Sequence, residues 1–312
     1  MYYIGFDIGG TKCAVSLGEV VDGTITVLGR EETPTTLPEE TFDRLAPTLA
    51  RFQADKEIAG AGISCGGPLD TENGVILTPP NLPKWHGFAI VSYIKKRFGL
   101  NAVLENDANA CAVAEWRFGA GKGAKNMVFC TFGTGLGAGL ILNGKLYGGA
   151  NGNAGEIGHI RLASRGPVGY GKAGSFEGFC SGGGIARLAV DMAKRQKQIP
   201  DCIVKMGGLN SVTTKKLSEY AFAGDSFAKK VFEKSGRMLG RGLSIVIDML
   251  NPEKIVLGGV FMRSGTLLIP AMEKEIKKNA LENSAVACEI VAAKLSENVG
   301  DIAAISIAVL ER

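Results

Sequence analysis

The chain has 312 residues, of which 46% are hydrophobic and 21% are charged, and its formal net charge is +4. This length allows two domains with separate cores, because a single core usually stops growing near ~250–300 residues. The basic residues are spread along the chain without a run of five or more like charges. Nucleic acid and anionic membranes are therefore not expected as its main partners.

Seven cysteines are scattered along the chain and never stand in a C-x-x-C spacing. A disulfide framework is not expected, and neither is a zinc site built mainly from cysteine. The N-terminus has neither the basic region nor the long apolar region of a signal peptide, and no apolar stretch reaches the ~18 residues of a membrane span. We therefore expect a cytoplasmic protein.

The expected elements alternate between strands and helices over the first part of the chain. Short strands are expected at 2–8, 13–20 and 24–31, separated by Gly9-Gly10-Thr11-Lys12 and by Asp22-Gly23, a strong hairpin signal. The next elements are a helix over 39–54, a buried strand over 58–65, a helix over 88–98, a strand over 102–105 and an Ala-rich helix ending near 118.

A second run of the same pattern begins near residue 126. Strands are expected at 126–132 and 137–142, with the turn Gly133-Thr134-Gly135 between them and a hairpin signal at Asn143-Gly144. The repetition predicts two lobes of similar plan, each opening with a glycine hairpin. Because small ligands bind in clefts between domains, we expect a ligand cleft between the lobes.

The rest of the chain begins with a glycine-rich stretch over 145–184 that has little periodic pattern. A structureless stretch of that length is uncommon and often functional. Helices are then expected at 183–197, 213–222, 225–249, 267–280 and 299–311, with strands at 254–257 and 286–292. The mixture of hairpins with alternating strands and helices predicts an α/β protein.

The two glycine turns are candidate phosphate sites. Backbone N–H groups can converge on an anion where little or no Cβ intervenes. In the first turn Thr11 adds a hydroxyl and Lys12 a cation, and in the second Thr134 adds a hydroxyl. A single turn of this kind is more often only a hairpin, but two of them in matching lobes favour phosphate binding.

Two acidic positions lie beside these features. Asp7 ends the first strand next to the first turn, where a carboxylate repels phosphate unless a cation such as Mg²⁺ lies between them. The alternative is an aspartate that only caps the hairpin. Asn106-Asp107 begins a helix, and both residue types are good N-caps. The alternative for Asp107 is a general base that takes a proton from a sugar hydroxyl as this hydroxyl attacks a γ-phosphate.

A third cluster, Glu156-Ile157-Gly158-His159, contains one of only two histidines in the chain. Glu177 adds another carboxylate in the same glycine-rich region. Carboxylates and amides with one histidine suit a polyol, because sugar hydroxyls donate to carboxylates and accept from amides. A purely structural role for His159 remains an alternative.

These residues belong to a series of motifs that resembles the ROK family (repressor, open reading frame, kinase), a branch of the actin, hexokinase and Hsp70 ATPase superfamily. Several motifs in the family's order are specific where one alone would not be. They are Asp7-Ile-Gly-Gly-Thr-Lys12, Gly67-Pro-Leu-Asp70, Pro80-Asn-Leu-Pro-Lys-Trp85, Glu105-Asn-Asp-Ala-Asn-Ala110, Thr131-Phe-Gly-Thr-Gly135, Gly155-Glu-Ile-Gly-His159 and Val256-Leu-Gly-Gly259.

The resemblance implies an α/β fold of two actin-like, ribonuclease H-like lobes around a central cleft, which closes on ATP and a hexose. Residues 1–106 with 298–312 would form the small lobe and residues 107–297 the large lobe, with the last helix packed on the first lobe. The implied cofactors are ATP and Mg²⁺. A homodimer is expected, because many relatives are homodimers.

Site residues are carried over from the same resemblance, motif by motif. Asp107 would be the catalytic base. The sugar would be bound by Gly67, Asn81, Asn106, Asp107, Glu156, His159 and Glu177. The ATP phosphates would lie on Gly9, Gly10, Thr11, Lys12, Gly133, Thr134 and Gly135, the adenosine on Gly258 and Gly259, and Mg²⁺ near Asp7, directly or through water.

One motif departs from the family pattern. Most ROK members carry C-x-C-G-x-x-G-C-x-E after the Gly-His, and its three cysteines bind zinc together with that histidine. Here Val168, Tyr170 and Ser175 stand at the cysteine positions, so zinc is not expected. Tyr170 and Phe176 are candidates to hold the loop by packing instead, and His159 could still hydrogen-bond the sugar.

The expected function is an ATP-dependent hexose kinase that acts at O6 of glucose or a close relative. Kinases for N-acetylmannosamine, N-acetylglucosamine, allose and fructose share the motifs and remain alternatives. A sugar-responsive transcriptional regulator is less favoured, because such proteins carry an added helix-turn-helix segment and the first lobe strand is expected here from residue 2. An inactive sugar binder is disfavoured by the presence of Asp107, Asp7 and both glycine turns.

Overall fold

The computed structural model describes residues 1–295 and 299–310, and it divides into two compact units. The first unit comprises Met1–Lys125, Gly139–Ala154 and the described part of Lys294–Arg312. The second comprises Asn126–Ala138 and Gly155–Ala293. The lobe boundary expected between residues 297 and 298 lies outside the described residues, and so do residues 311 and 312.

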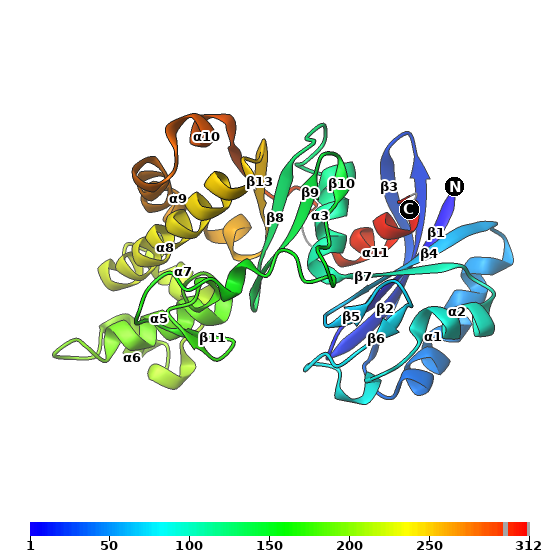
Figure 1. The fold of residues 1–312 in the computed structure, drawn as a ribbon. Coiled ribbons are helices and arrows are strands. Elements are labelled where there is room, and N and C mark those ends of the chain that lie inside the picture. Colours follow the sequence, from blue (N-terminus) through cyan, green and yellow to red (C-terminus); the bar gives the residue numbers. More distant parts are fainter. Residues whose placement is uncertain (296–298, 311–312) are drawn as a thin grey trace. The chain divides into compact units, whose positions relative to one another are not determined.

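The first unit contains a five-stranded sheet with the order β3-β2-β1-β4-β7 (Figure 1). β1 pairs antiparallel with β2 and parallel with β4, and β2 pairs antiparallel with β3. Both expected hairpins are therefore present. The strands are β1 (Tyr2–Ile8), β2 (Lys12–Val21), β3 (Thr24–Pro34), β4 (Ile58–Cys65) and β7 (Ala102–Asn106), and a small ribbon of β5 (Leu69–Asp70) and β6 (Val75–Ile76) follows β4 in the chain.

One face of this sheet packs against α1 (Pro38–Ala54) and α2 (Ile90–Phe98). Side chains alternate between the two faces of a strand, so Ile4, Phe6 and Ile8 of β1 point the same way, and all three are buried. Phe6 meets Phe42 of α1 edge to face, with 5.8 Å between the ring centroids. The hydrophobic core of the first unit thus lies between the sheet and these two helices.

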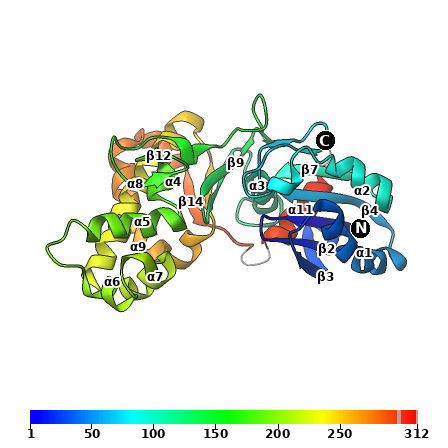
Figure 2. The same ribbon diagram turned by 90° about the horizontal axis from the view of Figure 1, so that it is seen from below.

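The opposite face carries glycines at the centre of the sheet, and α11 (Val299–Val309) packs directly on them (Figure 2). Gly5 of β1 and Gly62 of β4 are register partners. A Cβ at position 62 would lie 1.9 Å from the Ala304 carbonyl oxygen, and one at position 5 would lie 3.1 Å from the Ala304 Cβ. These glycines therefore let the helix backbone approach the sheet.

Replacing Gly62 by alanine should destabilise the fold by about 1–3 kcal/mol, because the methyl group overpacks a backbone contact that cannot move away. Gly60→Ala on the same strand is the matched control, since the nearest atom to a Cβ there is the Asn101 carbonyl oxygen at 3.7 Å. Urea unfolding of both variants measures the difference. An equal effect at the two positions would contradict the packing argument.

α3 (Asp107–Phe118) belongs to the first unit through its contacts with α11. The Glu115 carboxylate is buried and accepts the backbone N–H groups of Lys294 and Leu295, so it ties the returning chain to α3. The division expected from the sequence assigns this helix to the large lobe, whereas its packing groups it with residues 1–106. The small hydrophobic cluster between the two helices contains Ala110, Ala114, Ala303 and Ile307.

The second sheet has the order β10-β9-β8-β13-β14. β13 pairs in parallel with both β8 and β14, and β9 with β10 forms a hairpin at one edge. This is the order of the first sheet, with a hairpin on one side and parallel strands on the other, so the prediction of two lobes of similar plan is confirmed. The strands are β8 (Met127–Phe132), β9 (Leu136–Leu142), β10 (Lys145–Leu146), β13 (Lys254–Leu257) and β14 (Glu289–Ala292).

The second unit contains β8, β13, β14 and the start of β9, whereas β10 and the rest of β9 are grouped with the first unit. Helices and short ribbons complete the second unit, and α9 and α10 differ from expectation. α9 begins at Val260, directly after Gly259, rather than at residue 267, and α10 replaces the expected start of a strand at 286. Tertiary packing overrides the weak helix propensity of Ser264 and Gly265, both of which are buried in α9. The other elements are β11 (Val168–Gly169), β12 (Lys172–Ala173), α4 (Phe176–Phe179), α5 (Gly182–Ala193), α6 (Asp201–Lys205), α7 (Thr214–Phe222), α8 (Ser226–Leu250), α9 (Val260–Asn279) and α10 (Glu282–Ala287).

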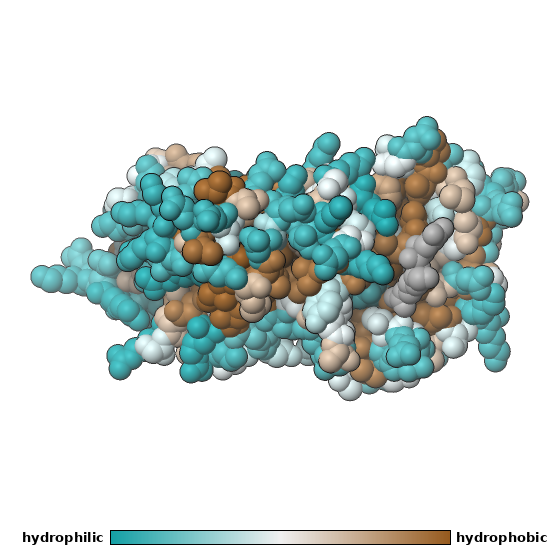
Figure 3. Space-filling view, turned by 45° about the horizontal axis from the view of Figure 1, so that its top comes forward, coloured by the Kyte–Doolittle hydropathy of each residue, from teal (hydrophilic) through white to brown (hydrophobic). Residues whose placement is uncertain are grey.

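Hydrophilic side chains cover most of the face seen in Figure 3, and hydrophobic ones gather in smaller areas between them. Within the described residues, no helix has the length and apolar character needed to cross a membrane.

Candidate active site

The first glycine turn joins β1 to β2 and packs against the loop that carries Asn81. The Gly9 N–H donates to the Lys12 carbonyl oxygen at 3.0 Å. A Cβ at position 10 would lie 2.6 Å from the Asn81 carbonyl oxygen, so only glycine allows this approach. The structure thus brings a predicted phosphate turn and a predicted sugar ligand together within the first unit.

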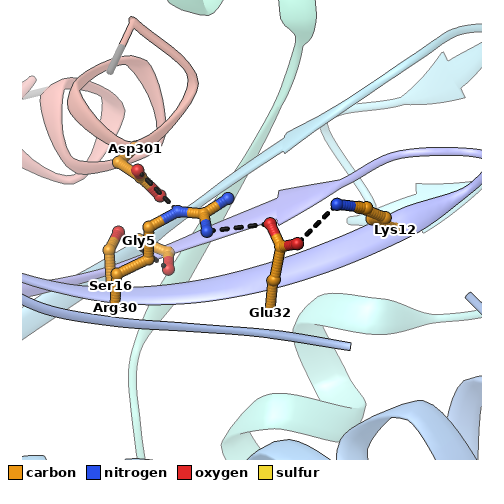
Figure 4. A network of polar contacts seen from close by, with 6 residues as sticks. All are labelled: Gly5, Lys12, Ser16, Arg30, Glu32 and Asp301. Atoms are coloured by element: carbon orange, nitrogen blue, oxygen red, sulfur yellow. Dashed lines mark hydrogen bonds and ion pairs between the residues drawn. The ribbon is translucent and has the colours of Figure 1, made fainter. Parts of the chain in front are cut away.

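Lys12 and Thr11 are both exposed on this turn. The Lys12 ammonium pairs with Glu32, which also accepts from Arg30, and Arg30 donates to Asp301 of α11 at 2.9 Å (Figure 4). The two cations hold the pKa of the Glu32 carboxyl below its usual range. The cation expected to meet phosphate is therefore part of a charge network that reaches from β2 through β3 to α11.

Asp7 points to the α11 face of the sheet, where a Cβ at position 300 would lie 2.7 Å from its Oδ2 atom. Burial, together with the nearby charges of Asp301 and Asp107, raises the pKa of Asp7 to about 6 against the opposing effect of Arg30. An excess of carboxylates around one position is a setting that a hard divalent cation relieves.

The residues around Asp7 fit a Mg²⁺ ion that takes only one or two ligands from the protein. Its remaining ligands would be oxygens of water and of substrate phosphates. No group of three or more His, Cys, Asp or Glu side chains placed to hold a metal occurs within residues 1–295 and 299–310. Mg²⁺ usually binds through one or two carboxylates together with waters and substrate phosphates, so a complete protein cage is not required.

Asn106 and Asp107 both lie at the start of α3, and only Asn106 is its N-cap residue. Asn106 is the N-cap, and its side chain accepts the Ala108 N–H at 3.0 Å. Its amide lies close to Gly67, since a Cβ at position 67 would be 3.3 Å from Asn106 Nδ2. Asp107 is exposed, and its Oδ1 also accepts the Ala108 N–H, at 2.8 Å. The cap is thus formed by Asn106 without requiring Asp107.

The second glycine turn lies in the second unit, beside the predicted adenosine glycines. The Gly133 N–H donates to the Gly135 carbonyl oxygen at 3.1 Å, and Thr134 between them is exposed. Gly259 has a positive φ of 58°, and a Cβ there would lie 2.1 Å from the Phe132 carbonyl oxygen. The Gly258 N–H donates to the Cys130 carbonyl oxygen at 3.0 Å. The end of β8 and the end of β13 therefore lie together.

The N-terminus of α5 also belongs to this region. The sequence predicts a helix from residue 183, but it does not predict that the start of this helix lies beside the second glycine turn. The Gly182 N–H donates to the Gly133 carbonyl oxygen at 2.7 Å, and Ser181 caps the helix by accepting the Gly184 N–H at 2.9 Å. Helix N-termini attract phosphate through their unpaired N–H groups and the helix dipole. The signal that could have identified it is a capping serine followed by three glycines.

The predicted sugar ligands of the second unit gather around the start of β9. The Leu136 N–H donates to Glu177 Oε2 at 3.1 Å. A Cβ at position 158 would lie 2.1 Å from the Leu136 carbonyl oxygen, so the turn that carries Glu156 and His159 is held against the same residue. His159 Nε2 lies 4.0 Å from Glu156 Oε2. The three candidate ligands Glu156, His159 and Glu177 are thus neighbours.

The loop that departs from the zinc pattern is ordered by other contacts. Phe176 is fully buried and packs on α8, where a Cβ at position 242 would lie 2.2 Å from its ring. Tyr170 is exposed, but its ring meets the His159 ring edge on, at 4.9 Å between centroids. Ser175 is buried and caps α4 by accepting the Gly178 N–H. At two of the three positions where the family pattern has zinc cysteines, Tyr170 and Ser175 therefore make a ring contact and a helix cap instead.

The purified protein is expected to contain no stoichiometric zinc. Val168, Tyr170 and Ser175 offer no thiolate, and a structural zinc site needs four ligands. Elemental analysis checks this directly. Treatment with a strong chelator should leave activity unchanged once Mg²⁺ is restored, whereas one zinc per chain would contradict the prediction.

Comparison with known proteins identifies the family. The chain matches the model of the ROK family over residues 3–310. The glucokinase of Thermotoga maritima is 31% identical over 306 residues, which cover 97% of this chain and 96% of that protein. A ROK family glucokinase from Streptomyces griseus, solved in complex with glucose and AMPPNP, has a TM-score of 0.78 at 30% identity and coverage of 99% of each chain.

A regulator has a similar fold. The structure of a ROK family transcriptional regulator, a homologue of the E. coli MLC protein, has a TM-score of 0.85 at 26% identity, and the match covers 98% of this chain and 78% of that one. The family thus includes both enzymes and regulators. Since the family model matches nearly the entire chain and a relative above 30% identity matches it from end to end, this chain belongs to the ROK family.

Proposed function

We propose that this chain transfers the γ-phosphoryl group of ATP to a hexose, at O6 of glucose or of a close relative. The observation that carries the proposal is the start of α3, where Asn106 caps the helix and Asp107 keeps an exposed carboxylate next to it. Full-length similarity to a glucokinase supports the substrate class.

Asp107 is proposed as the general base. It accepts the proton of the sugar hydroxyl as that oxygen attacks the γ-phosphorus, and ADP leaves. The turns at residues 9–12 and 133–135 and the N-terminus of α5 bind the phosphates through backbone N–H groups. Asp7 holds Mg²⁺, which when bound offsets the negative charge of the phosphates. The adenosine is proposed to lie on Gly258 and Gly259.

The sugar is proposed to be bound by the candidate ligands that the family motifs imply. Neighbouring carboxylates and amides can take several hydroxyl groups at once, which gives specificity for a polyol. We also propose that the functional lobes are divided as the family motifs imply, with residues 1–106 and the C-terminal helix in one lobe and residues 107–297 in the other, although α3 packs with the first unit. The proposed sugar ligands are Gly67, Asn81, Asn106, Asp107, Glu156, His159 and Glu177.

A sugar-responsive regulator is the second candidate, and the similarity to the regulator structure favours it. It would bind the sugar through the same residues without using a base. A regulator of this kind would hold hexose but would not release ADP from ATP in its presence. The kinase is preferred because Asp107, Asp7 and both glycine turns are present together.

A coupled assay of ADP release across a panel of hexoses tests the proposal and identifies the sugar. The panel should contain glucose, mannose, fructose, allose, N-acetylglucosamine and N-acetylmannosamine, with ATP and Mg²⁺ in excess. We expect glucose to have the highest kcat/KM. Sugar binding without any sugar-dependent ADP release would refute the kinase and favour the regulator.

We further propose a cytoplasmic homodimer. All seven cysteines are free, in keeping with a reducing compartment. The dimer rests on the family resemblance alone, and sedimentation analysis of the full chain would decide it.

A further inference from the structure

A cavity of about 540 Å³ lies within the second unit, and no predicted site residue lines it. Its walls come from the loop before β11, from Phe179 of α4, and from the facing sides of α5 and α8. No residue of either glycine turn lines it, and none of the candidate sugar ligands does. It is therefore a separate pocket that the proposed reaction does not use.

The rim of this cavity is strongly cationic. Six basic side chains line it against two carboxylates, Asp191 and Glu233. Glu233 lies 3.9 Å from Arg237, and Arg241 pairs with Glu275 at 3.1 Å. Within the described residues, no ion pair joins the other four to a carboxylate. The basic residues are Arg165, Arg195, Lys230, Lys234, Arg237 and Arg241.

The cations also act on one another. Burial lowers the pKa of Lys234, and the charges of Arg237, Arg241 and Arg195 lower it further, with Glu275 opposing them. Three neighbouring cations thus disfavour the charged form of Lys234, and one carboxylate favours it. The pocket therefore carries a positive field that an anion would relieve.

The inner surface of the cavity is apolar. Phe179 and Leu188 are buried there, and Met192 and Met238 complete the wall. The loop before β11 packs closely on the Phe179 ring at Gly166. A Cβ at this position would lie 2.3 Å from the ring. A ligand that only carried charge would leave this surface unused.

We propose that this pocket binds a small organic phosphate, with the phosphate at the basic rim and the organic group on the apolar wall. Arginine suits this role because its planar guanidinium binds phosphate oxygens in pairs. The volume lies within the range of small-molecule sites. The inference does not depend on the proposed kinase activity.

Calorimetric titration of the full chain with 1-naphthyl phosphate tests the proposal. The pocket variant is Arg195→Gln with Lys234→Gln, and the matched control is Lys229→Gln with Lys277→Gln, which removes the same charge from exposed positions outside the cavity. We expect the pocket variant to raise Kd at least about tenfold, because hydrogen bonds to charged groups are lost. The control should bind like the wild type. Any binding of 1-naphthyl phosphate at the ATP site would persist in both variants, which distinguishes it from binding in the pocket.

Two further measurements test the contribution of the organic group and the integrity of the pocket. Inorganic phosphate should bind at least about tenfold more weakly than naphthyl phosphate, because it leaves the apolar wall uncovered. The charge-preserving variant Arg195→Lys with Lys234→Arg should retain binding, which shows that the pocket still forms. The proposal is overturned if naphthyl phosphate does not bind the wild type at millimolar concentration, if inorganic phosphate binds equally well, or if the pocket variant and the control behave alike.

Discussion

Replacing Asp107 by asparagine is expected to lower kcat for hexose phosphorylation by about 10²–10⁴-fold, the usual contribution of a general base. Asparagine keeps the size of the side chain and an oxygen that can accept the Ala108 N–H. It cannot take the proton of the attacking hydroxyl. Because the N-cap of α3 is Asn106, the helix should form as before.

The separation of binding from chemistry makes this test specific. Sugar affinity, measured by calorimetry without ATP, should stay close to that of the wild type, so the loss should appear in kcat. Asp22→Asn is the matched control, because Asp22 is exposed in the β2–β3 turn at a positive φ that asparagine tolerates. A wild-type rate for the Asp107 variant would show that the base is another group.

Replacing Asp7 by asparagine should have opposite effects on activity and on stability. Activity should fall strongly, because the variant loses the carboxylate proposed to hold Mg²⁺. In metal-free buffer at neutral pH, the variant should be more stable than the wild type by up to about 3 kcal/mol. The reason is that folding raises the pKa of the Asp7 carboxyl from 3.8 to about 6, and keeping this group ionised in the folded state costs about that much free energy. A functional group held at a cost to stability is a common arrangement in active sites.

The direction of the pH dependence follows from the raised pKa. Asp7 has a pKa of about 6 in the folded chain against 3.8 when unperturbed, so the folded state binds this proton more tightly than the unfolded state. Ionisation of Asp7 therefore costs stability progressively as the pH rises from about 4 to 6. The advantage of the asparagine variant should vanish below pH ~4 and reach its full size above pH ~6. Denaturant unfolding at several pH values measures this, and a variant that is less stable than the wild type at pH 7 would contradict it.

Local signals in the sequence account for much of the fold. The hairpins around the first glycine turn and Asp22-Gly23, and their counterparts after residue 126, were predicted because turn residues and strand alternation act over a few neighbouring residues. The equal strand order of the two sheets follows from that repetition. For the same reason, Asp107 and both glycine turns were identified as candidate site residues, since each stands in a short motif.

The tertiary structure decided the features that depend on contacts between distant segments. Gly5 and Gly62 gave no signal of their role until α11 was placed on them, and α3 joins the first unit because its alanines meet that same helix. The α5 N-terminus meets Gly133, and Asn81 meets Gly10, across long stretches of chain. The cationic pocket likewise draws its walls from four separate segments. Residue types and spacing determine turns and periodicity, whereas close packing between backbones is set only when the whole chain has folded.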